Sequence, residues 1–330
     1  MRPEIYLDYA RLAAPPPAAF IARLKKALGG LDRYPDTDYK LAKGAIARRH
    51  KVNAGNIALG NGVDELIDSI TRLGKEEVII PTPTFGQYET AAKRMGRKIK
   101  LIDCISVAGF DLAALEPHLP EARLIWICNP NNPMGCGLDT RQIEDIANRT
   151  GGLVVVDEAC IGFPEKNTLI CQAPKRKNMV VLRTFSKSFG LAGLRIGYAV
   201  ANPDLIAQLE SIRQPFNVNL LAQEAIPLAL QMESAFKARY LKMAERREKL
   251  SAALVALGYD VMPSETNFVT WKMADKKAAI RLFKRLRSRR IHILPPGSDE
   301  FSGMPGNWLR ITVGSEFENR LLIKAAKDWQ

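Results

Sequence analysis

Short runs of mostly apolar residues, many of them β-branched, recur between residues 57 and 182. They lie at residues 57–59, 77–80, 98–102, 124–128, 153–156 and 179–182. Segments in which apolar residues recur at helical spacing accompany them, at residues 38–50, 66–73 and 87–96. Strands that alternate with helices predict a parallel sheet with helices packed against its faces. The run at 179–182 is typical of an interior strand of such a sheet.

The pattern changes in the last third of the chain. A long helical region is expected at about residues 220–257; short strands at 267–271, 291–294 and 309–313 and helices at 275–289 and 316–328 follow. This mixture predicts a small α+β domain. Near the N-terminus, Pro15 to Pro17 interrupt regular structure. We therefore expect an N-terminal arm over residues 1–28 that packs with the small domain, a large α/β domain over 29–235 and the small domain over 236–330.

Composition narrows the class of protein. The 330 residues are 47% hydrophobic, which is enough for a large core. No run of about 18 apolar residues occurs, so we expect no membrane span, and the first residues lack the apolar core of a secretory signal. The five cysteines are odd in number and never spaced as CxxC, so we expect no disulfide framework and no metal site. Reduced thiols favour a cytoplasmic protein.

The chain is basic, with 48 Lys and Arg against 35 Asp and Glu, a net charge of +13. The excess lies in short runs scattered over helix-like segments, without interleaved aromatic residues. Such a distribution favours solvated helix faces and a field that attracts small anionic substrates. Nucleic-acid binding is the less favoured reading, because a binding surface would gather the basic residues into one track.

Polar side chains follow three of the predicted strands at the point where each strand ends. Asn132 follows the strand at 124–128, Asp157 follows 153–156, and Lys187 follows 179–182. Because parallel strands deliver their carboxyl ends to one sheet edge, where open α/β sheets bind ligands, we expect these side chains to converge. Each also has a plain structural interpretation, as a turn residue, a paired acid or a solvated lysine.

The stretch from Thr184 to Gly197 carries the most chemistry. A lysine with a lowered pKa forms a Schiff base with an aldehyde. Thr184, Ser186 and Arg195 can donate hydrogen bonds to a phosphate. A carboxylate at the end of an apolar strand, such as Asp157, needs a cationic partner, and a pyridinium nitrogen is one. Aldehyde, phosphate and pyridine together describe pyridoxal 5′-phosphate (PLP); the alternative is an ordinary surface loop.

Two further segments fit the same cofactor. Phe85 follows the strand at 77–80, where its ring can stack on a flat cofactor or belong to the core. Gly60 to Gly62 precede a predicted helix, so the backbone N–H groups of Val63 and Asp64 can bind an anion. A glycine turn that only starts a helix explains this second segment equally well.

With these residues assembled, the chain resembles fold-type I PLP enzymes of the class I/II aminotransferase group, and within it the histidinol-phosphate aminotransferases. The resemblance runs from about Tyr34 to Val313. It implies the aspartate aminotransferase fold, a large α/β domain with a mainly parallel sheet plus a small α+β domain. The motifs that carry it lie at residues 33–36 (RYPD), 60–67 (GNGVDELI), 129–135 (NPNNPMG), 156–159 (VDEA), 186–197 (SKSFGLAGLRIG), 215–219 (PFNVN) and 309–314 (LRITVG).

The resemblance also implies roles for single residues. The catalytic residues would be Lys187, as Schiff-base lysine, and Asp157, as partner of the pyridine nitrogen. Residues expected to bind the cofactor besides these two are Val63, Asp64, Phe85, Asn132, Cys160, Thr184, Ser186 and Arg195. Tyr34 would reach the phosphate of the neighbouring subunit, which implies an obligate homodimer. The expected substrate-binding residues are Arg310, Arg11 and Asn267, with Arg310 holding the anionic end of an amino or keto substrate.

The chain departs from the family pattern at three places that concern the substrate or the ring. Cys160 stands where related transaminases carry a tyrosine that bonds the ring hydroxyl. Leu294 is followed by two prolines, where histidinol-phosphate enzymes carry a second arginine. The N-terminal substrate segment is replaced by residues 7–11. Arg11 can replace the lost cation, or it is a solvated arginine of the arm.

Three functions follow from these observations. The first is an aminotransferase of the histidinol-phosphate type that exchanges an amino group with glutamate and 2-oxoglutarate. The second is a PLP-dependent threonine-phosphate decarboxylase, a relative that also tends to lack the tyrosine at position 160. The third is a non-catalytic PLP-fold binding protein, which residues 1–30 disfavour because they are too short for a DNA-binding domain.

Overall fold

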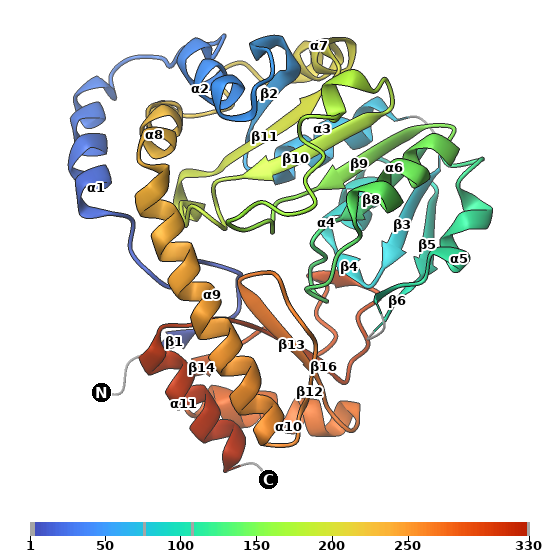
Figure 1. The fold of residues 1–330 in the computed structure, drawn as a ribbon, viewed down its shortest axis with the longest axis vertical. Coiled ribbons are helices and arrows are strands. Elements are labelled where there is room, and N and C mark those ends of the chain that lie inside the picture. Colours follow the sequence, from blue (N-terminus) through green and yellow to red (C-terminus); the bar gives the residue numbers. More distant parts are fainter. Residues whose placement is uncertain (1–3, 75–76, 107–108, 329–330) are drawn as a thin grey trace.

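A seven-stranded sheet forms the centre of the computed structural model, which describes residues 4–74, 77–106 and 109–328 (Figure 1). Within these residues the strand order is β2-β11-β10-β9-β8-β3-β5. The pairs from β10 to β5 are parallel, whereas β11 is antiparallel to both β2 and β10. The prediction of a mainly parallel sheet is confirmed. The strands are β2 (Ile57–Asn61), β3 (Val78–Thr82), β5 (Ile99–Asp103), β8 (Leu124–Cys128), β9 (Leu153–Asp157), β10 (Met179–Thr184) and β11 (Ile196–Ala201).

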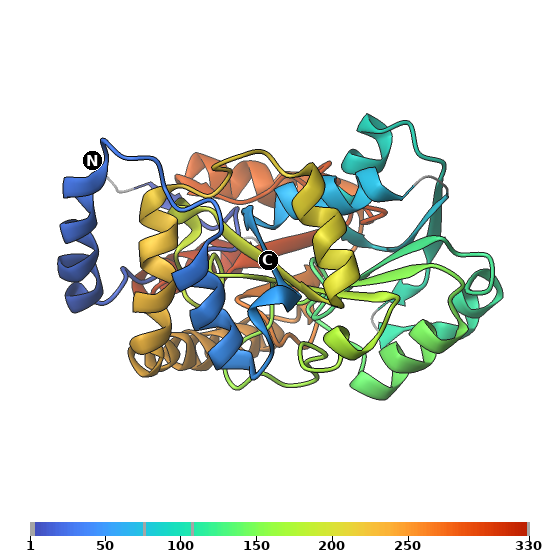
Figure 2. The ribbon, with the colours of Figure 1, turned by 90° about the horizontal axis from the view of Figure 1, so that it is seen from above.

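The interior strands β3, β8, β9 and β10 are buried on both faces, which explains why they consist mostly of apolar residues. Alternate residues enter opposite cores: Ile79 belongs to the core that includes residues of α2, α6 and α8, whereas Ile80 belongs to the core that includes residues of α3, α4 and α7. Figure 2 shows the sheet between these two layers of helices. The helices are α2 (Lys40–His50), α3 (Val63–Leu73), α4 (Gln87–Arg94), α5 (Leu112–Leu115), α6 (Thr140–Arg149), α7 (Pro203–Ile212) and α8 (Leu220–Gln231).

The C-terminal part is smaller and lies below the large sheet in Figure 1. Its three-stranded antiparallel sheet has the order β12-β13-β16, and α9, α10 and α11 pack beside it. The helical region expected at 220–257 is divided at Met232, whose backbone (φ −103°, ψ 20°) separates α8 from α9. α9 then runs from the large part into the small one. The elements are α9 (Glu233–Ala256), β12 (Asp260–Val261), β13 (Phe268–Lys272), α10 (Lys276–Ser288), β16 (Trp308–Thr312) and α11 (Glu316–Lys327).

The N-terminal segment touches both parts. β1 (Ile5–Tyr6) pairs in parallel with β14 (Ile291–His292), and Leu7 accepts a hydrogen bond from the backbone of Thr312, 3.0 Å away. After the prolines, α1 (Ala18–Leu24) and the 3-10 helix η1 (Lys25–Gly30) run beside α8 (Figure 1). The ring of Phe20 packs edge-on against Phe236 of α9, with centroids 5.2 Å apart. Residues 7–14 therefore cross the boundary between the two parts.

A second crossing was not apparent from the sequence. β4 (Thr84–Phe85), from the large part, pairs antiparallel with β15 (Phe301–Ser302), from the small part. Because the two strands are more than 200 residues apart in the chain, no local pattern signals their pairing. The remaining short elements are β6 (Ile105–Ser106), β7 (Gly109–Phe110), η2 (Ala54–Asn56), η3 (Glu116–His118), η4 (Ala173–Lys175) and η5 (Ala192–Leu194).

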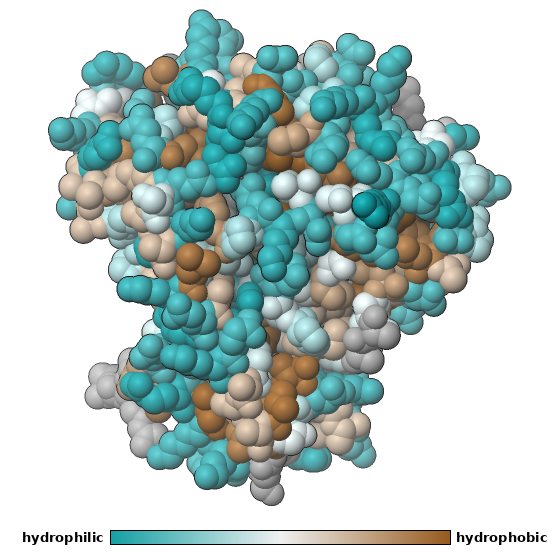
Figure 3. Space-filling view, in the orientation of Figure 1, coloured by the Kyte–Doolittle hydropathy of each residue, from teal (hydrophilic) through white to brown (hydrophobic). Residues whose placement is uncertain are grey.

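The surface is mostly hydrophilic on the face seen in Figure 3. Among the basic runs found in the sequence, Lys25, Lys26 and Arg48 are exposed. In the described ranges of the chain, no helix combines the length and the apolar character that crossing a membrane requires.

Candidate functional site

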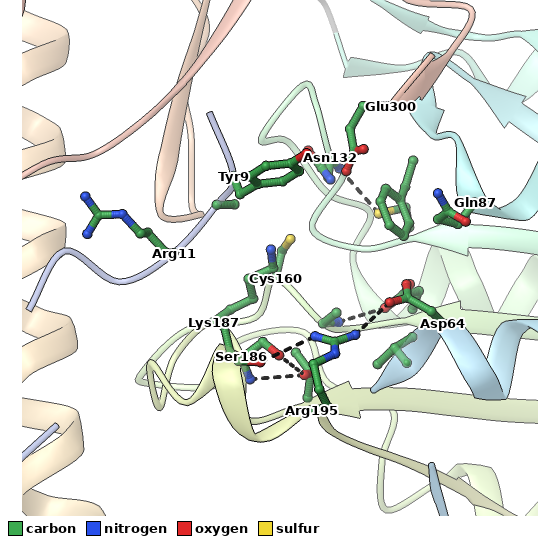
Figure 4. A pocket seen from close by; sticks show the side chains of 18 of the residues that line it. Tyr9, Arg11, Asp64, Gln87, Asn132, Cys160, Ser186, Lys187, Arg195 and Glu300 are labelled. Atoms are coloured by element: carbon green, nitrogen blue, oxygen red, sulfur yellow. Dashed lines mark hydrogen bonds and ion pairs between the residues drawn. The ribbon is translucent and has the colours of Figure 1, made fainter. Parts of the chain in front are cut away.

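A cavity of about 600 Å³ opens at the carboxyl ends of β8, β9 and β10 (Figure 4). The small part and the N-terminal segment form the side of the cavity that faces these strand ends. Asn132, Asp157 and Lys187 all line this cavity, so the three strand ends do converge. Nine other residues named from the sequence also line it: Arg11, Val63, Asp64, Phe85, Cys160, Thr184, Ser186, Arg195 and Arg310.

Lys187 enters the cavity from the loop that follows β10. The loop is held by Phe185, which is fully buried, and by a hydrogen bond of 3.0 Å from the backbone of Gly190 to that of Lys187. Burial lowers the pKa of the Lys187 amine; the nearby charge of Arg310 acts in the same direction, and Cys160 opposes both. A lowered pKa leaves more of the amine neutral, which is the nucleophilic form.

Asp157 lies at the floor of the cavity and is only 2% exposed. Its carboxylate accepts hydrogen bonds from the Tyr88 hydroxyl at 2.7 Å and from the Ala159 backbone at 2.9 Å. Burial nevertheless raises the pKa of Asp157 to about 6, against these two donors. A carboxylate so placed is stabilised when a ligand brings a cationic N–H group to it.

The neighbouring acid, Glu158, has the opposite environment. It is fully buried, yet its carboxylate accepts hydrogen bonds from Arg183 Nε at 2.7 Å, the Thr168 hydroxyl at 2.8 Å and the Leu169 backbone at 2.7 Å. Glu158 therefore has a cationic partner within the chain and a structural role, whereas Asp157 faces the cavity. Successive strand residues point to opposite faces, and this separates the two acids.

Tyr88, on α4, was not singled out from the sequence. Its ring stacks on Trp126 with centroids 4.7 Å apart and planes at 7°, which fixes its hydroxyl against Asp157. Phe85 packs edge-on against Tyr88 at 5.7 Å and lines the cavity. The spacing of three residues that brings the two rings together is visible in the sequence; the partner of the Tyr88 hydroxyl is not.

The corner of the cavity at the start of α3 carries groups that suit an anion. α3 begins at Val63, directly after Gly62 (φ 78°), which has no side chain to cap the first N–H groups. A Cβ atom on Gly62 would lie 2.3 Å from Arg195 Nη2, so only glycine leaves room for that guanidinium. The hydroxyls of Thr184 and Ser186 are 3.0 Å apart at the same corner. Backbone N–H groups, hydroxyls and a guanidinium together suit a phosphate.

Arg310, on β16, forms the wall on the side of the small part. It is 3% exposed, and burial lowers its pKa to about 10. One terminal nitrogen donates to the Asn132 amide oxygen at 3.3 Å, and the other donates to the backbone of Asp8. Its Nε atom is buried without a partner among the described residues. A buried cation with a spare donor is suited to hold an anionic group of a ligand.

Cys160 lies in the cavity wall, where burial raises the pKa of its thiol to about 11. The thiol is therefore neutral at pH 7, and a thiol donates weaker hydrogen bonds than a phenol. Related transaminases carry a tyrosine at this position, whose hydroxyl donates a hydrogen bond to the ring oxygen. The thiol of Cys160 is a weaker donor than that hydroxyl.

Three residues named from the sequence have other surroundings. Tyr34 is 83% exposed, packs at a tilt against Phe216 with centroids 4.8 Å apart and does not line the cavity. The Arg11 guanidinium points away from Lys187 (Figure 4) and donates to Glu318 and to the Tyr6 backbone, both at 3.1 Å. The side-chain environment of Arg11 therefore agrees with its interpretation as an arginine of the N-terminal arm rather than a substrate-binding cation.

Asn267 is buried outside the cavity lining. Its amide nitrogen donates to the backbone carbonyls of Ala10 and Arg11, at 2.9 and 3.1 Å. These bonds hold the N-terminal segment over the cavity, so Asn267 acts on the site through that segment.

Other residues line the cavity without having been named from the sequence. Most come from the N-terminal segment, from α3 and α4, or from the loop before β15, and most of them lie outside the motifs. They are Tyr9, Ala10, Glu65, Asp68, Gln87, Arg94, Cys128, Ala159, Ala192 and Glu300.

The residues present fit PLP. The lysine amine suits an aldehyde, the buried carboxylate of Asp157 suits a pyridinium nitrogen, and the corner around Gly62 suits a phosphate. Phe85 presents a ring in the same cavity.

Comparison with known proteins agrees with this chemistry. The family model "Aminotransferase class I and II" matches residues 5–325. A histidinol-phosphate aminotransferase of Cytophaga hutchinsonii is 37% identical over 91% of this chain and 86% of its own length. The crystal structure of histidinol-phosphate aminotransferase from Sinorhizobium meliloti in complex with pyridoxal-5′-phosphate matches with a TM-score of 0.92 and 26% identity, over 99% of this chain and 90% of that one.

The relative suggested as an alternative is also found. L-threonine-O-3-phosphate decarboxylase from Porphyromonas gingivalis matches with a TM-score of 0.85 and 26% identity, over 98% of this chain and 99% of that one. These matches confirm the predicted fold and the predicted cofactor, PLP. The chain belongs to the aminotransferase class I and II family and is a PLP-dependent aminotransferase.

Proposed function

We propose that this protein transfers the amino group of histidinol phosphate to 2-oxoglutarate. The observation that carries the proposal is Arg310, a buried cation whose Nε has no partner among the described residues and which lines the same cavity as Lys187. An arginine of this kind suits the phosphate of such a substrate and the carboxylate of the keto acid. The 37% identity to a histidinol-phosphate aminotransferase supports the choice of substrate.

PLP, when bound, supplies an aldehyde that reacts with amines and a ring that withdraws electrons from the substrate Cα atom. We assign the covalent attachment to Lys187 Nζ, whose lowered pKa favours the neutral amine. The same nitrogen, once free, takes the proton from the substrate Cα atom. Asp157 would hold the pyridine nitrogen protonated, and Tyr88 orients Asp157 through its 2.7 Å hydrogen bond.

The remaining residues bind and orient. Arg195, Ser186 and Thr184 would hold the cofactor phosphate together with the backbone N–H groups at the start of α3. Asn132 would donate a hydrogen bond to the ring hydroxyl, and the Cys160 thiol in the same cavity is a weaker donor. Phe85 would pack against the cofactor ring, and Arg310 would bind the anionic end of the substrate. The N-terminal segment, held by Asn267, excludes water from above.

We further propose that the active protein is a homodimer in which Tyr34 completes the site of the neighbouring subunit. Tyr34 is exposed and does not line the cavity of its own subunit. Exposed apolar side chains lie near it in the sequence, including Leu28, Leu31 and Leu41. Exposed apolar side chains gathered in one region are typical of an interface. The arm over 1–28, the large domain over 29–235 and the small domain over 236–330 remain our proposed division of the chain.

The test is a transamination assay with the purified holoenzyme. L-Histidinol phosphate and 2-oxoglutarate should yield glutamate, with ping-pong kinetics and a loss of the cofactor's absorbance on adding the amine alone. Lys187→Ala provides the blank. If no glutamate forms from histidinol phosphate and 2-oxoglutarate, the choice of substrate is refuted.

Decarboxylation of threonine phosphate is the second candidate, favoured by Cys160 and by the similarity to the Porphyromonas gingivalis enzyme. It predicts release of carbon dioxide from threonine phosphate without any need for a keto acid. The two assays on one preparation therefore separate the candidates.

A further inference from the structure

Glu300 places a carboxylate in the cavity from the loop before β15. Its backbone carbonyl accepts a hydrogen bond from the Gly86 N–H at 2.8 Å, and its own N–H donates to the Ser298 hydroxyl at 3.2 Å. A Cβ atom on Gly86 would lie 2.5 Å from the carbonyl of Asp299, so the loop approaches β4 as closely as glycine allows. The pairing of β4 with β15 thus fixes Glu300 on the wall that also carries Phe85.

The carboxylate of Glu300 has no hydrogen-bond or ion-pair partner in the parts of the chain that the structure describes. Burial raises the pKa of Glu300, and the charges of Arg310 and Lys187 oppose this from a distance. Figure 4 shows the carboxylate pointing into the cavity from the side opposite to Ser186 and Arg195. It therefore lies on the substrate side and away from the corner that suits the cofactor phosphate.

The other charged groups around the cavity already have partners. The carboxylate of Glu65 accepts hydrogen bonds from the Asn61 backbone and from the Asn217 amide nitrogen. Asp64 pairs with Arg195 at 2.7 Å, and Arg94 pairs with Asp68 at 3.2 Å. Arg11 pairs with Glu318 at 3.1 Å.

Lys187 and Asp157 are assigned to the cofactor. Arg310 and Glu300 are then the two charged groups left for a substrate, one a cation and the other an anion. A half-buried carboxylate without a partner gains stability when a ligand brings it a charged N–H donor.

We propose that Glu300 determines specificity by accepting a hydrogen bond from a basic nitrogen in the substrate's side chain. The substrate class is an amino compound with an anionic group for Arg310 and a protonatable nitrogen for Glu300. This rests on the proposed function and deepens it, since the imidazole of histidinol phosphate is such a nitrogen. Glutamate, the other amino compound, has a second carboxylate in place of the basic nitrogen, and Glu300 repels it.

The test compares Glu300→Gln with Asp299→Asn in the holoenzyme. Glutamine keeps the shape of the side chain and removes its charge. Asp299 is exposed, lies in the same loop outside the cavity lining and undergoes the same change of charge. The substrates form two pairs that differ in the ring: L-histidinol phosphate with L-phenylalaninol phosphate, and L-histidine with L-phenylalanine. Single-turnover rates and equilibrium dissociation constants are measured for each.

Glu300→Gln should weaken binding and reaction of the basic member of a pair by about 10- to 100-fold, the range of one charged hydrogen bond. The phenyl member should change by less than about 3-fold, and Asp299→Asn should leave both members unchanged. Glutamate should react with Glu300→Gln as fast as with the native enzyme, or faster. A residue that only shapes the loop would slow all substrates alike.

Three results would overturn the inference: no preference of the native enzyme for the basic member of either pair, a preference that survives in Glu300→Gln, or an equal loss in Asp299→Asn. A native enzyme that rejects histidinol phosphate but prefers histidine to phenylalanine through Glu300 refutes the proposed substrate and leaves the inference standing. The two failures are therefore distinguishable.

Discussion

Replacing Asp157 with asparagine should make the cofactor-free protein more stable at neutral pH while it impairs cofactor binding. Burial raises the pKa of Asp157 from 3.8 to about 6, a shift of about two units. One unit corresponds to about 1.4 kcal/mol, so the ionised carboxylate costs the folded state about 3 kcal/mol. Asparagine has a similar shape and carries no charge, so it avoids this cost.

The sign follows from proton binding. Below about pH 4 the acid is protonated in both the folded and the unfolded chain, so its burial costs no ionisation energy. Between about pH 4 and 6 the unfolded chain has lost the proton and the folded chain still holds it, so a rise in pH favours unfolding. The whole cost is present at pH 7. The stabilisation by Asp157→Asn should therefore grow by about 3 kcal/mol between pH 4 and pH 7.

The assay is urea unfolding of the cofactor-free protein at several pH values, for the native chain and Asp157→Asn. Asp260→Asn, at an exposed position, controls for the loss of one negative charge. A difference in unfolding free energy that does not change between pH 4 and pH 7 would refute the reasoning. Titration with PLP should show the opposite order of affinity, because the variant cannot pair with the pyridinium nitrogen.

Two further predictions concern the assembly and the thiols. Lys187→Ala and Tyr34→Ala should each be inactive alone, but subunits mixed after dissociation should regain activity. The reason is that one site of each mixed dimer combines an intact Lys187 with an intact Tyr34. A mixture that is no more active than its components would contradict the shared site. Iodoacetamide at pH 8 should modify the exposed Cys171 well before Cys160, because burial raises the pKa of the Cys160 thiol to about 11. Peptide mass spectrometry follows the two reactions. Rapid alkylation of Cys160 in the folded protein would show that its thiol is not buried.

The sequence by itself determined the sheet, the cofactor and the residues at the strand ends. Apolar runs bounded by turns predicted β8, β9 and β10, and the parallel arrangement brings their carboxyl ends to one edge. Asn132, Asp157 and Lys187 could therefore be placed together without coordinates. The reason is physical: period and burial are local properties of a strand, and they locate the end of each strand to within about two residues.

Only the tertiary structure decided what surrounds those residues. The bond from Tyr88 to Asp157, the pairing of Arg11 with Glu318 and the entry of Glu300 into the cavity each join segments that are distant in the chain. Arginine and glutamate have long side chains, and the same backbone position allows an ion pair at the surface or a place in the cavity. Which one is realised depends on contacts such as the pairing of β4 with β15, which no local pattern encodes.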